Sequence, residues 1–158
     1  MLKRTSKQLS MFSSLEDMLS HQHPLFQLSN KINWECFENA FSPLYCNTNG
    51  RPAHPIRLMC GLLILKHLRN VSDEMVVSQW SENAYYQYFC GGLEFMPKQP
   101  CDASELVHFR NRIGEEGMEL ILAESIRVNT DHDDEDHFDT AFIDSTVQEK
   151  NITYPTDA

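Results

Sequence analysis

Hydrophobic residues along the first 130 positions recur at helical spacing and predict a series of helices. The strongest stretch begins at Pro55, because a proline is favoured in the first turn of a helix, and closes at Asn70. Its apolar face is unusually wide, since Leu58, Leu62 and Leu65 extend a stripe that is already continuous. A helix that is apolar on most sides is expected in the middle of a bundle.

Two helices are predicted before this central one. Ser13 and Glu16 form a capping-box pattern for a short helix from about Ser14 to Ser20, and the prolines at 24 and 43 mark breaks. Between those breaks, apolar residues predict a single helix that ends at Pro43: Ile32, Trp34, Phe37 and Phe41.

Two segments have the composition of loops, one before the central helix and one after the helix that follows it. Residues 46–52 and 91–100 are rich in Gly, Pro and Asn. Between them, Ser72 or Asp73 is expected to cap a helix that ends near Cys90. Its predicted apolar stripe consists of Val77, Trp80, Ala84 and Tyr88.

A second capping pattern, Asp102 with Glu105, starts the last helical region. Gly114 and Gly117 weaken a helix and predict a break within this region. The inward residues before the break are predicted to be Leu106, Phe109 and Ile113, with Glu105, His108 and Arg112 on the opposite face. After the break, a further helix is predicted from Leu120, Ile121, Glu124 and Val128.

The pattern changes after residue 130. Residues 131–139 are an acidic run that cannot pack, which predicts a linker. In residues 140–158 an apolar run leads into Asp144, and a polar turn then separates it from a second β-prone segment. The sequence therefore predicts a mainly α chain: a helical bundle over 1–130, the linker, and a C-terminal β-hairpin.

Charge and composition limit the possible functions. The net charge is −10, but residues 1–130 carry 12 Lys/Arg against 14 Asp/Glu, so the acidity lies mostly in the tail. A nearly balanced helical part permits nucleic-acid binding by a local patch. We expect a cytoplasmic protein with no membrane segment and no signal peptide. The five cysteines have no C-x-x-C spacing and indicate neither disulfides nor a zinc site.

Asp144 is the main candidate for chemistry, because a carboxylate at the end of an apolar strand needs a partner. One interpretation is a metal ion held at the edge of a sheet. The other is an aspartate that hydrogen-bonds its own turn, and spacing alone favours this second interpretation.

The segment around Asp144 resembles a known family. The string Phe142-Ile-Asp-Ser-Thr-Val, followed by Asn151-Ile-Thr-Tyr-Pro-Thr-Asp157, is similar to the first catalytic segment of insertion-sequence DDE transposases, in particular the InsH-like group of the insertion-sequence-five family. The resemblance implies that the hairpin opens a ribonuclease-H-like domain. It also implies that Asp144 is a catalytic, metal-binding carboxylate, the first of three.

Such enzymes use two Mg²⁺ (or Mn²⁺) ions, and the resemblance implies these cofactors for the complete enzyme. The family's other two acids lie far downstream of the hairpin. One carboxylate cannot position two ions, so we expect this chain alone to be inactive and to bind no metal stably. Glu149, Asp157 and the acids at 131–139 are poorer ligand candidates, because a solvated linker explains such a charge run.

The helical part resembles the family's N-terminal domain more loosely, through Arg51-Pro52 with Pro55, Val71-Ser-Asp73, Tyr88-Phe-Cys-Gly91 and Ser104 to Arg110. In the family this domain recognises the element's terminal inverted repeats. Three consecutive helices joined by turns would form a helix-turn-helix-like unit. The candidate DNA-binding residues are Lys66, Arg69, His108, Arg110 and Arg112. Their alternative role is a solvated helix surface.

We therefore expect a truncated transposase: a DNA-binding helical domain with the first catalytic strand. Its gene is interpreted as decayed, or as the upstream half of a protein completed by frameshifting. The rival hypothesis is a non-enzymatic interaction module that forms homo-oligomers or inhibits an intact transposase through mixed complexes.

Overall fold

A computed structural model describes residues 14–46 and 48–130 of the chain. Within these ranges the secondary structure is helical throughout, which confirms the mainly α prediction for this part. The elements are α1 (Leu15–Met18), α2 (Pro24–Lys31), α3 (Trp34–Phe41), the short 3-10 helix η1 (Ser42–Leu44), α4 (Ile56–Arg69), α5 (Asp73–Glu82), α6 (Ala84–Phe89) and α7 (Ala103–Thr130).

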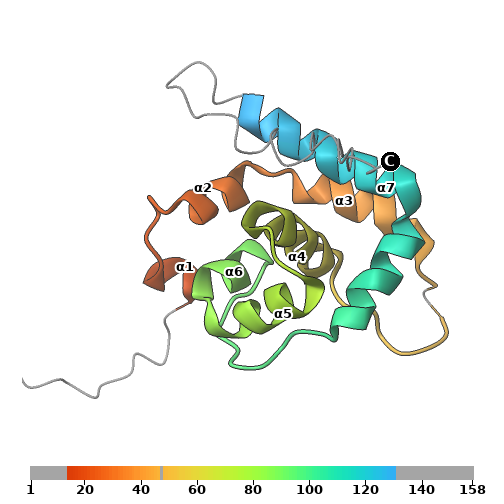
Figure 1. Cartoon of the computed structure of the whole chain (residues 1–158), viewed down its shortest axis with the longest axis horizontal. Coiled ribbons are helices and arrows are strands. Elements are labelled where there is room, and N and C mark those ends of the chain that lie inside the picture. The colour runs from red at the N-terminus through yellow and green to blue at the C-terminus, as the bar shows by residue number, and fades with distance from the viewer. Residues whose placement is uncertain (1–13, 47, 131–158) are drawn as a thin grey trace, which may run out of the picture.

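Helix α4 lies at the centre of the bundle, and Figure 1 shows the other helices around it. It is buried from Leu58 through Leu65, as its wide apolar face predicts. Asn70 ends it in the left-handed conformation, with φ 51°, and its backbone N–H bonds back to the carbonyls of the last turn. The sequence prediction for this helix is confirmed at both ends.

The N-terminal region holds one helix more than the sequence predicts. The helix predicted before Pro43 corresponds to α3, and α2 is the helix that the prediction missed. The Asn33 side chain accepts a hydrogen bond from the Cys36 N–H and starts α3. Pro24 begins α2 rather than only ending what precedes it. The cap of α1 is Ser14, one position later than the capping-box pattern indicates.

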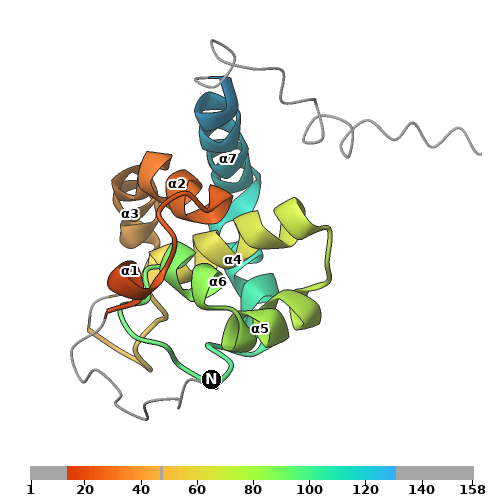
Figure 2. The same cartoon turned by 90° about the vertical axis from the view of Figure 1, so that its left-hand side faces the viewer.

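A second capping asparagine divides the next predicted helix. Helix α5 starts where Ser72 accepts a hydrogen bond from the Met75 N–H, so Ser72 is the cap. It ends at Glu82, and the Asn83 side chain then accepts from Tyr85 and Tyr86 to start α6. The predicted single helix to Cys90 is therefore two helices. Figure 2 shows both beside α4.

The last helix, α7, changes direction at Gly114, which has φ 66° and ψ −170° inside an otherwise helical segment. This confirms the predicted break. Gly117 lies within the second half, buried against Ile113 and Phe41. Of the residues that define the two predicted halves, Leu120 is half-buried, and the others are buried: Leu106, Phe109, Ile113, Ile121, Glu124 and Val128.

The second half of α7 is fastened to the junction of α2 and α3. The Glu124 carboxylate accepts the Asn33 N–H at 2.7 Å and both Nε and Nη2 of Arg127, and Arg127 also donates to the Lys31 carbonyl at 3.1 Å. The hydrogen bond from Arg127 is the main reason that the pKa of Glu124 is lowered. This contact explains why an acid occupies a buried position.

Two predictions concern residues outside the described ranges. These are the acidic linker over 131–139 and the β-hairpin over 140–158, including Asp144. Among residues 14–46 and 48–130, no helix has both the length and the apolar character that a membrane crossing needs.

Candidate nucleic-acid interface

Helices α4 and α5 are joined by a short turn. Only three residues, 70–72, separate the two helices, with the left-handed Asn70 closing one and Ser72 capping the other. Helix α7 packs on both helices. Turns of three or four residues are typical of helix pairs that present one member to a DNA groove.

A network of charged residues joins these three helices. Asp73, the first residue of α5, accepts two hydrogen bonds of 2.8 Å from the Arg110 guanidinium on α7. The Lys66 ammonium on α4 lies 3.0 Å from the same carboxylate. The hydrogen bonds from Arg110 are the largest cause of the fall in the pKa of Asp73 to about 2, so this side chain stays ionised. Lys66 and Arg110, two predicted DNA-binding residues, are thereby brought together.

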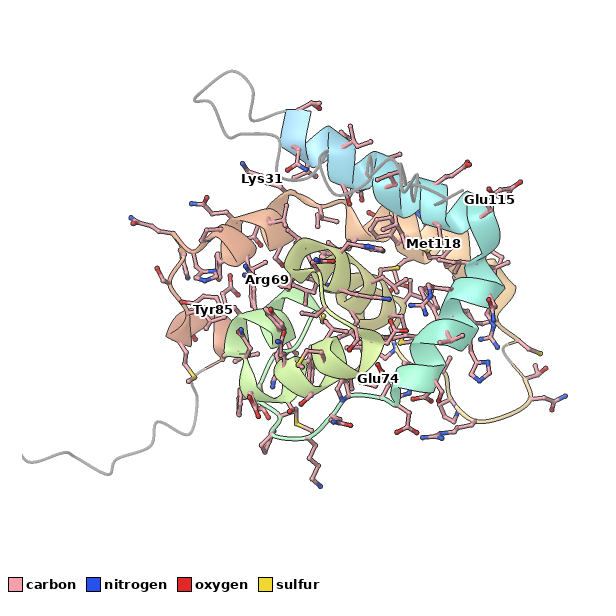
Figure 3. The ribbon with its side chains drawn as sticks, in the orientation of Figure 1. Lys31, Arg69, Glu74, Tyr85, Glu115 and Met118 are labelled. Atoms are coloured by element: carbon pink, nitrogen blue, oxygen red, sulfur yellow. The ribbon has the colours of Figure 1, made fainter. Side chains whose placement is uncertain are left out.

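Arg69 lies one turn further along α4 than Lys66. Its guanidinium is 5.9 Å from the centre of the Tyr86 ring on α6, and Arg69 is labelled in Figure 3. Desolvation, together with the charges of Lys66 and Arg110, lowers the pKa of His67. We call Lys66, Arg69 and Arg110 the basic corner. Two of its cations also complement the C-terminal end of the α4 dipole, which is a structural role.

His108 and Arg112 do not join the basic corner. Both are exposed on another side of α7, as the helical spacing predicts. The Arg112 guanidinium lies 4.4 Å from the centre of the Tyr45 ring, in the segment that precedes α4. The five predicted residues therefore form two groups. Lys66, Arg69 and Arg110 form the basic corner, whereas His108 and Arg112 lie on another side of α7.

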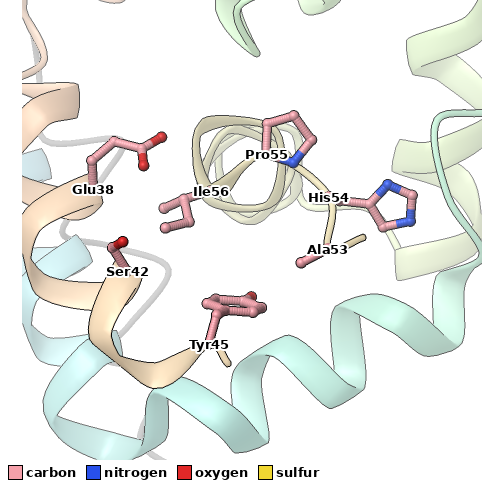
Figure 4. Close-up of a pocket in the computed structure, with 7 residues that line it drawn as sticks. All are labelled: Glu38, Ser42, Tyr45, Ala53, His54, Pro55 and Ile56. Atoms are coloured by element: carbon pink, nitrogen blue, oxygen red, sulfur yellow. The ribbon is translucent and has the colours of Figure 1, made fainter. Parts of the chain in front are cut away.

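One cavity lies near Tyr45, the residue that Arg112 contacts. It has a volume of about 210 Å³ and is bordered by Glu38, Ser42, Tyr45 and His54. Figure 4 shows the His54 ring turned away from Glu38 and Ser42. The ring instead hydrogen-bonds Glu105 at 3.1 Å. A serine, a histidine and an acid thus line one cavity without the hydrogen bonds that would activate a nucleophile.

The described residues contain no metal-binding cluster, and their buried thiols are unreactive. Within residues 14–46 and 48–130, no three His, Cys, Asp or Glu side chains are grouped closely enough to hold a metal ion. Burial raises the pKa of the Cys60, Cys90 and Cys101 thiols, which keeps them protonated. Asp144 lies beyond the described ranges, so its role as a catalytic residue stays a prediction.

Sequence reasoning assigned Asp73 only a possible capping role and missed its place at the centre of the network. The sequence does contain a signal for the contact between Asp73 and α4, because Asp73 follows a predicted helix that ends in Lys66 and Arg69. The cap is Ser72, which leaves the Asp73 carboxylate available for the cations.

The fold is a helical bundle, with a short turn between α4 and α5 and cations beside that turn. A comparison with protein families matches residues 13–112 to the family described as Transposase domain (DUF772). The chain belongs to this family of transposase domains.

A relative from Rhizobium meliloti, described as "Uncharacterized protein ORF8 in nfe locus", is 39% identical over 146 residues, which cover 91% of this chain and 70% of the relative. No solved structure matches the chain. The predicted relation to transposases is therefore confirmed at the level of the domain family.

Proposed function

We propose that the chain is the DNA-recognition part of an insertion-sequence transposase of the InsH-like DDE group. In this proposal the helical bundle binds the terminal inverted repeats of the element. Membership of a transposase domain family supports it. The finer assignment rests on the resemblance around Asp144.

The observation that carries the DNA-binding proposal is the basic corner. Lys66 and Arg110 come from helices far apart in the chain, yet both are held by the single carboxylate of Asp73, whose side chain is 13% exposed. Two cations share this one carboxylate, and Arg69 follows one turn later on α4, so positive charge remains near the α4–α5 turn. Cations already fixed by an ion pair lose less side-chain freedom on binding a phosphate.

We assign the chemistry of the complete protein to Mg²⁺-dependent phosphoryl transfer, with Asp144 as one metal ligand. Two metal ions held by carboxylates would activate the attacking oxygen and stabilise the leaving one. Hard cations of this kind prefer carboxylate oxygens. This assignment is independent of whether the bundle alone binds DNA.

The test measures fluorescence anisotropy of two labelled duplexes of equal length. One carries the terminal inverted repeat that flanks the gene, and the other carries the same bases in shuffled order. The proposal expects tighter binding to the repeat and a linear fall in log affinity with log salt concentration. Equal affinity for both duplexes at every salt concentration would refute recognition of the repeat.

Charge variants locate the interface. Lys66→Gln and Arg69→Gln are each expected to reduce the salt slope by about 1, the loss of one phosphate contact. Lys98→Gln, in the loop between α6 and α7, is the matched control with the same charge change. Arg112→Gln tests the other side of α7. If only Arg112→Gln weakens binding, the basic corner is the wrong surface.

The alternative function is a self-associating module. Leu122 and Ile126 favour it, because they lie one turn apart on α7 and are each 53% exposed. Two such side chains cover far less than the roughly 1,200 Å² of a stable interface. Light scattering after size exclusion decides the matter: dimers together with no DNA binding would favour this alternative.

A further inference from the structure

Arg57, near the start of α4, has a positive charge that no described carboxylate balances. Its Nη2 donates to the Ser29 hydroxyl at 2.9 Å and its Nε to the Phe89 carbonyl at 3.4 Å. Both acceptors are neutral, and no Asp or Glu of residues 14–46 and 48–130 comes within ion-pair distance.

The surroundings of Arg57 hold its guanidinium in one position. The group lies 4.6 Å from the centre of the Trp34 ring, a distance typical of a cation–π contact. Gly91, with φ 89°, packs its backbone on the arginine stem, since a Cβ there would lie 2.9 Å from Arg57 Cδ. Desolvation lowers the pKa of Arg57, which shows that the charge is partly removed from water. A charge in such a place is costly unless something pairs with it.

Arg57 borders the second cavity of the bundle, an open space of about 340 Å³ between α1, α2, α3, α4 and the loop after α6. Ser29, Asn30 and Tyr88 line the same cavity. The Arg57 Nη1 hydrogen-bonds no described residue and is not buried, so it is accessible for a further contact.

The neighbouring polar groups have hydrogen-bond donors to spare. The Ser29 hydroxyl accepts from Arg57 and can therefore donate its own proton. The Tyr88 hydroxyl donates to the Asn30 side-chain oxygen at 3.2 Å, which leaves the Asn30 amide nitrogen available as a donor. Donors from three side chains thus border one cavity, as in sites that bind oxyanions. Glu16 lies on its rim and opposes an anion.

We propose that the Arg57 cavity binds a phosphate group through the Arg57 guanidinium, with Ser29 and Asn30 as further donors. The phosphate is either free inorganic phosphate or a phosphate of the DNA backbone. Arg57 and Lys66 are nine residues apart on α4, about 14 Å along the axis and on opposite sides of the helix. The site is therefore separate from the basic corner and does not depend on it.

The first experiment titrates the purified chain with sodium phosphate at constant ionic strength, balanced with sodium chloride. The readouts are the melting temperature and the NMR signal of the Arg57 Nε–H group. Phosphate is expected to raise the melting temperature beyond the chloride control and to move the Arg57 signal in a saturable manner. No change in either readout would overturn the proposal.

Three variants test residues that border the cavity, and a fourth is a control outside it. Arg57→Gln is expected to weaken phosphate binding by about tenfold or more, the usual cost of losing a charge-assisted hydrogen bond. Asn30→Asp adds a negative charge inside the cavity and is expected to have a similar effect. Asn39→Asp on α3 is its matched control and should bind like the wild type. Glu16→Gln removes the opposing charge and should tighten binding.

These outcomes also separate binding from a purely structural role of Arg57. If Arg57→Gln fails to fold, the comparison of Asn30→Asp with Asn39→Asp decides, since neither removes the Arg57 contacts. Equal phosphate affinity for these two variants would overturn the proposal. If Glu16 is instead the true partner of Arg57, Glu16→Gln would lower stability without tightening binding, which would also overturn it.

The same variants in the anisotropy assay identify the source of the phosphate. Loss of duplex affinity in both Arg57→Gln and Asn30→Asp assigns the site to the DNA backbone, and unchanged duplex affinity assigns it to free phosphate. Lys66→Gln should leave the affinity for inorganic phosphate unchanged. Failure of repeat recognition is therefore distinguishable from failure of the phosphate site.

Discussion

Asp73 offers the sharpest test of the structure, because one carboxylate joins α4, α5 and α7. Replacing it with asparagine removes the charge that holds Lys66 and Arg110 while keeping the size of the side chain. The pKa of Asp73 falls from 3.8 to about 2, chiefly through the hydrogen bonds from Arg110. At 1.36 kcal/mol per pKa unit, this shift corresponds to about 2 kcal/mol of stability.

The sign follows from the lowered pKa. A carboxyl that is more acidic in the folded state stabilises the fold at any pH well above its unfolded pKa of about 3.9. This contribution disappears as the pH falls toward 2. Asp73→Asn is therefore expected to be less stable than the wild type by about 2 kcal/mol at pH 7, and the difference should shrink steadily below pH 4.

Urea unfolding followed by tryptophan fluorescence at pH 7, 4 and 2.5 measures this difference, since Trp34 and Trp80 both report on the bundle. Glu74→Gln is the matched control, because Glu74 is the next residue, is exposed and makes no ion pair with a described residue. A wild-type stability for Asp73→Asn at pH 7 would refute the reasoning. So would a loss that persists unchanged at pH 2.5.

Four further predictions follow from single contacts. Gly114→Ala should cost about 1–3 kcal/mol in thermal unfolding, because the backbone there has a conformation that suits only glycine, although a Cβ would meet nothing within 4 Å; an unchanged melting temperature would contradict this. Gly61→Ala should destabilise by about 1–3 kcal/mol, since its Cβ would lie 2.7 Å from Cys90 Sγ; a gain in stability would mean that helix propensity outweighs the clash. Glu124→Gln should speed hydrogen exchange at the Asn33 amide, and the stability that Glu124 provides through its lowered pKa should be present at neutral pH and fall in acid; equal exchange rates in variant and wild type would refute it. The 158-residue chain with Mg²⁺ or Mn²⁺ should leave duplex DNA uncut on a denaturing gel, because one carboxylate cannot position two ions; any metal-dependent product would prove this wrong.

The hydrophobic pattern was sufficient to predict the interior of the fold. Helix α4 is buried along most of its length because its sequence is apolar on nearly every side. Leu106, Phe109 and Ile113 face inward on α7, as their spacing requires. These features are local, since they depend only on residues within one helix.

The helix boundaries that were wrong have a common cause. Asn33 and Asn83 each lie inside a stretch whose apolar spacing continues, and each side chain caps a new helix. The hydrophobic periodicity depends on the apolar residues, and one asparagine among them does not change it. A capping residue decides the backbone path through a hydrogen bond to the next turn, which the apolar pattern does not contain.

The candidate site was only partly predictable, because its contacts join distant parts of the chain. Arg110 and Asp73 are 37 positions apart, and Arg57 and Ser29 are 28 apart. The sequence identified Lys66, Arg69 and Arg110 as cations on helices, which is a local property. The closeness of Lys66 and Arg69 to Asp73 in the chain was a signal for a contact with α4. Nothing local indicated that Arg110 would join it, or that Arg57 would lack a carboxylate among the described residues.

The bend in α7 has a consequence for anything attached beyond it. The sixteen residues after Gly114 extend for about 24 Å, and the contacts of Glu124 and Arg127 hold their far end against the start of α3 and the end of α2. Residue 130 is thus held in a defined position on the bundle, and the second half of α7 separates it from the α4–α5 turn. A domain that followed residue 130 would start on the α2 side of the bundle. The distance between a bound repeat and a cleavage site would then depend on this starting position.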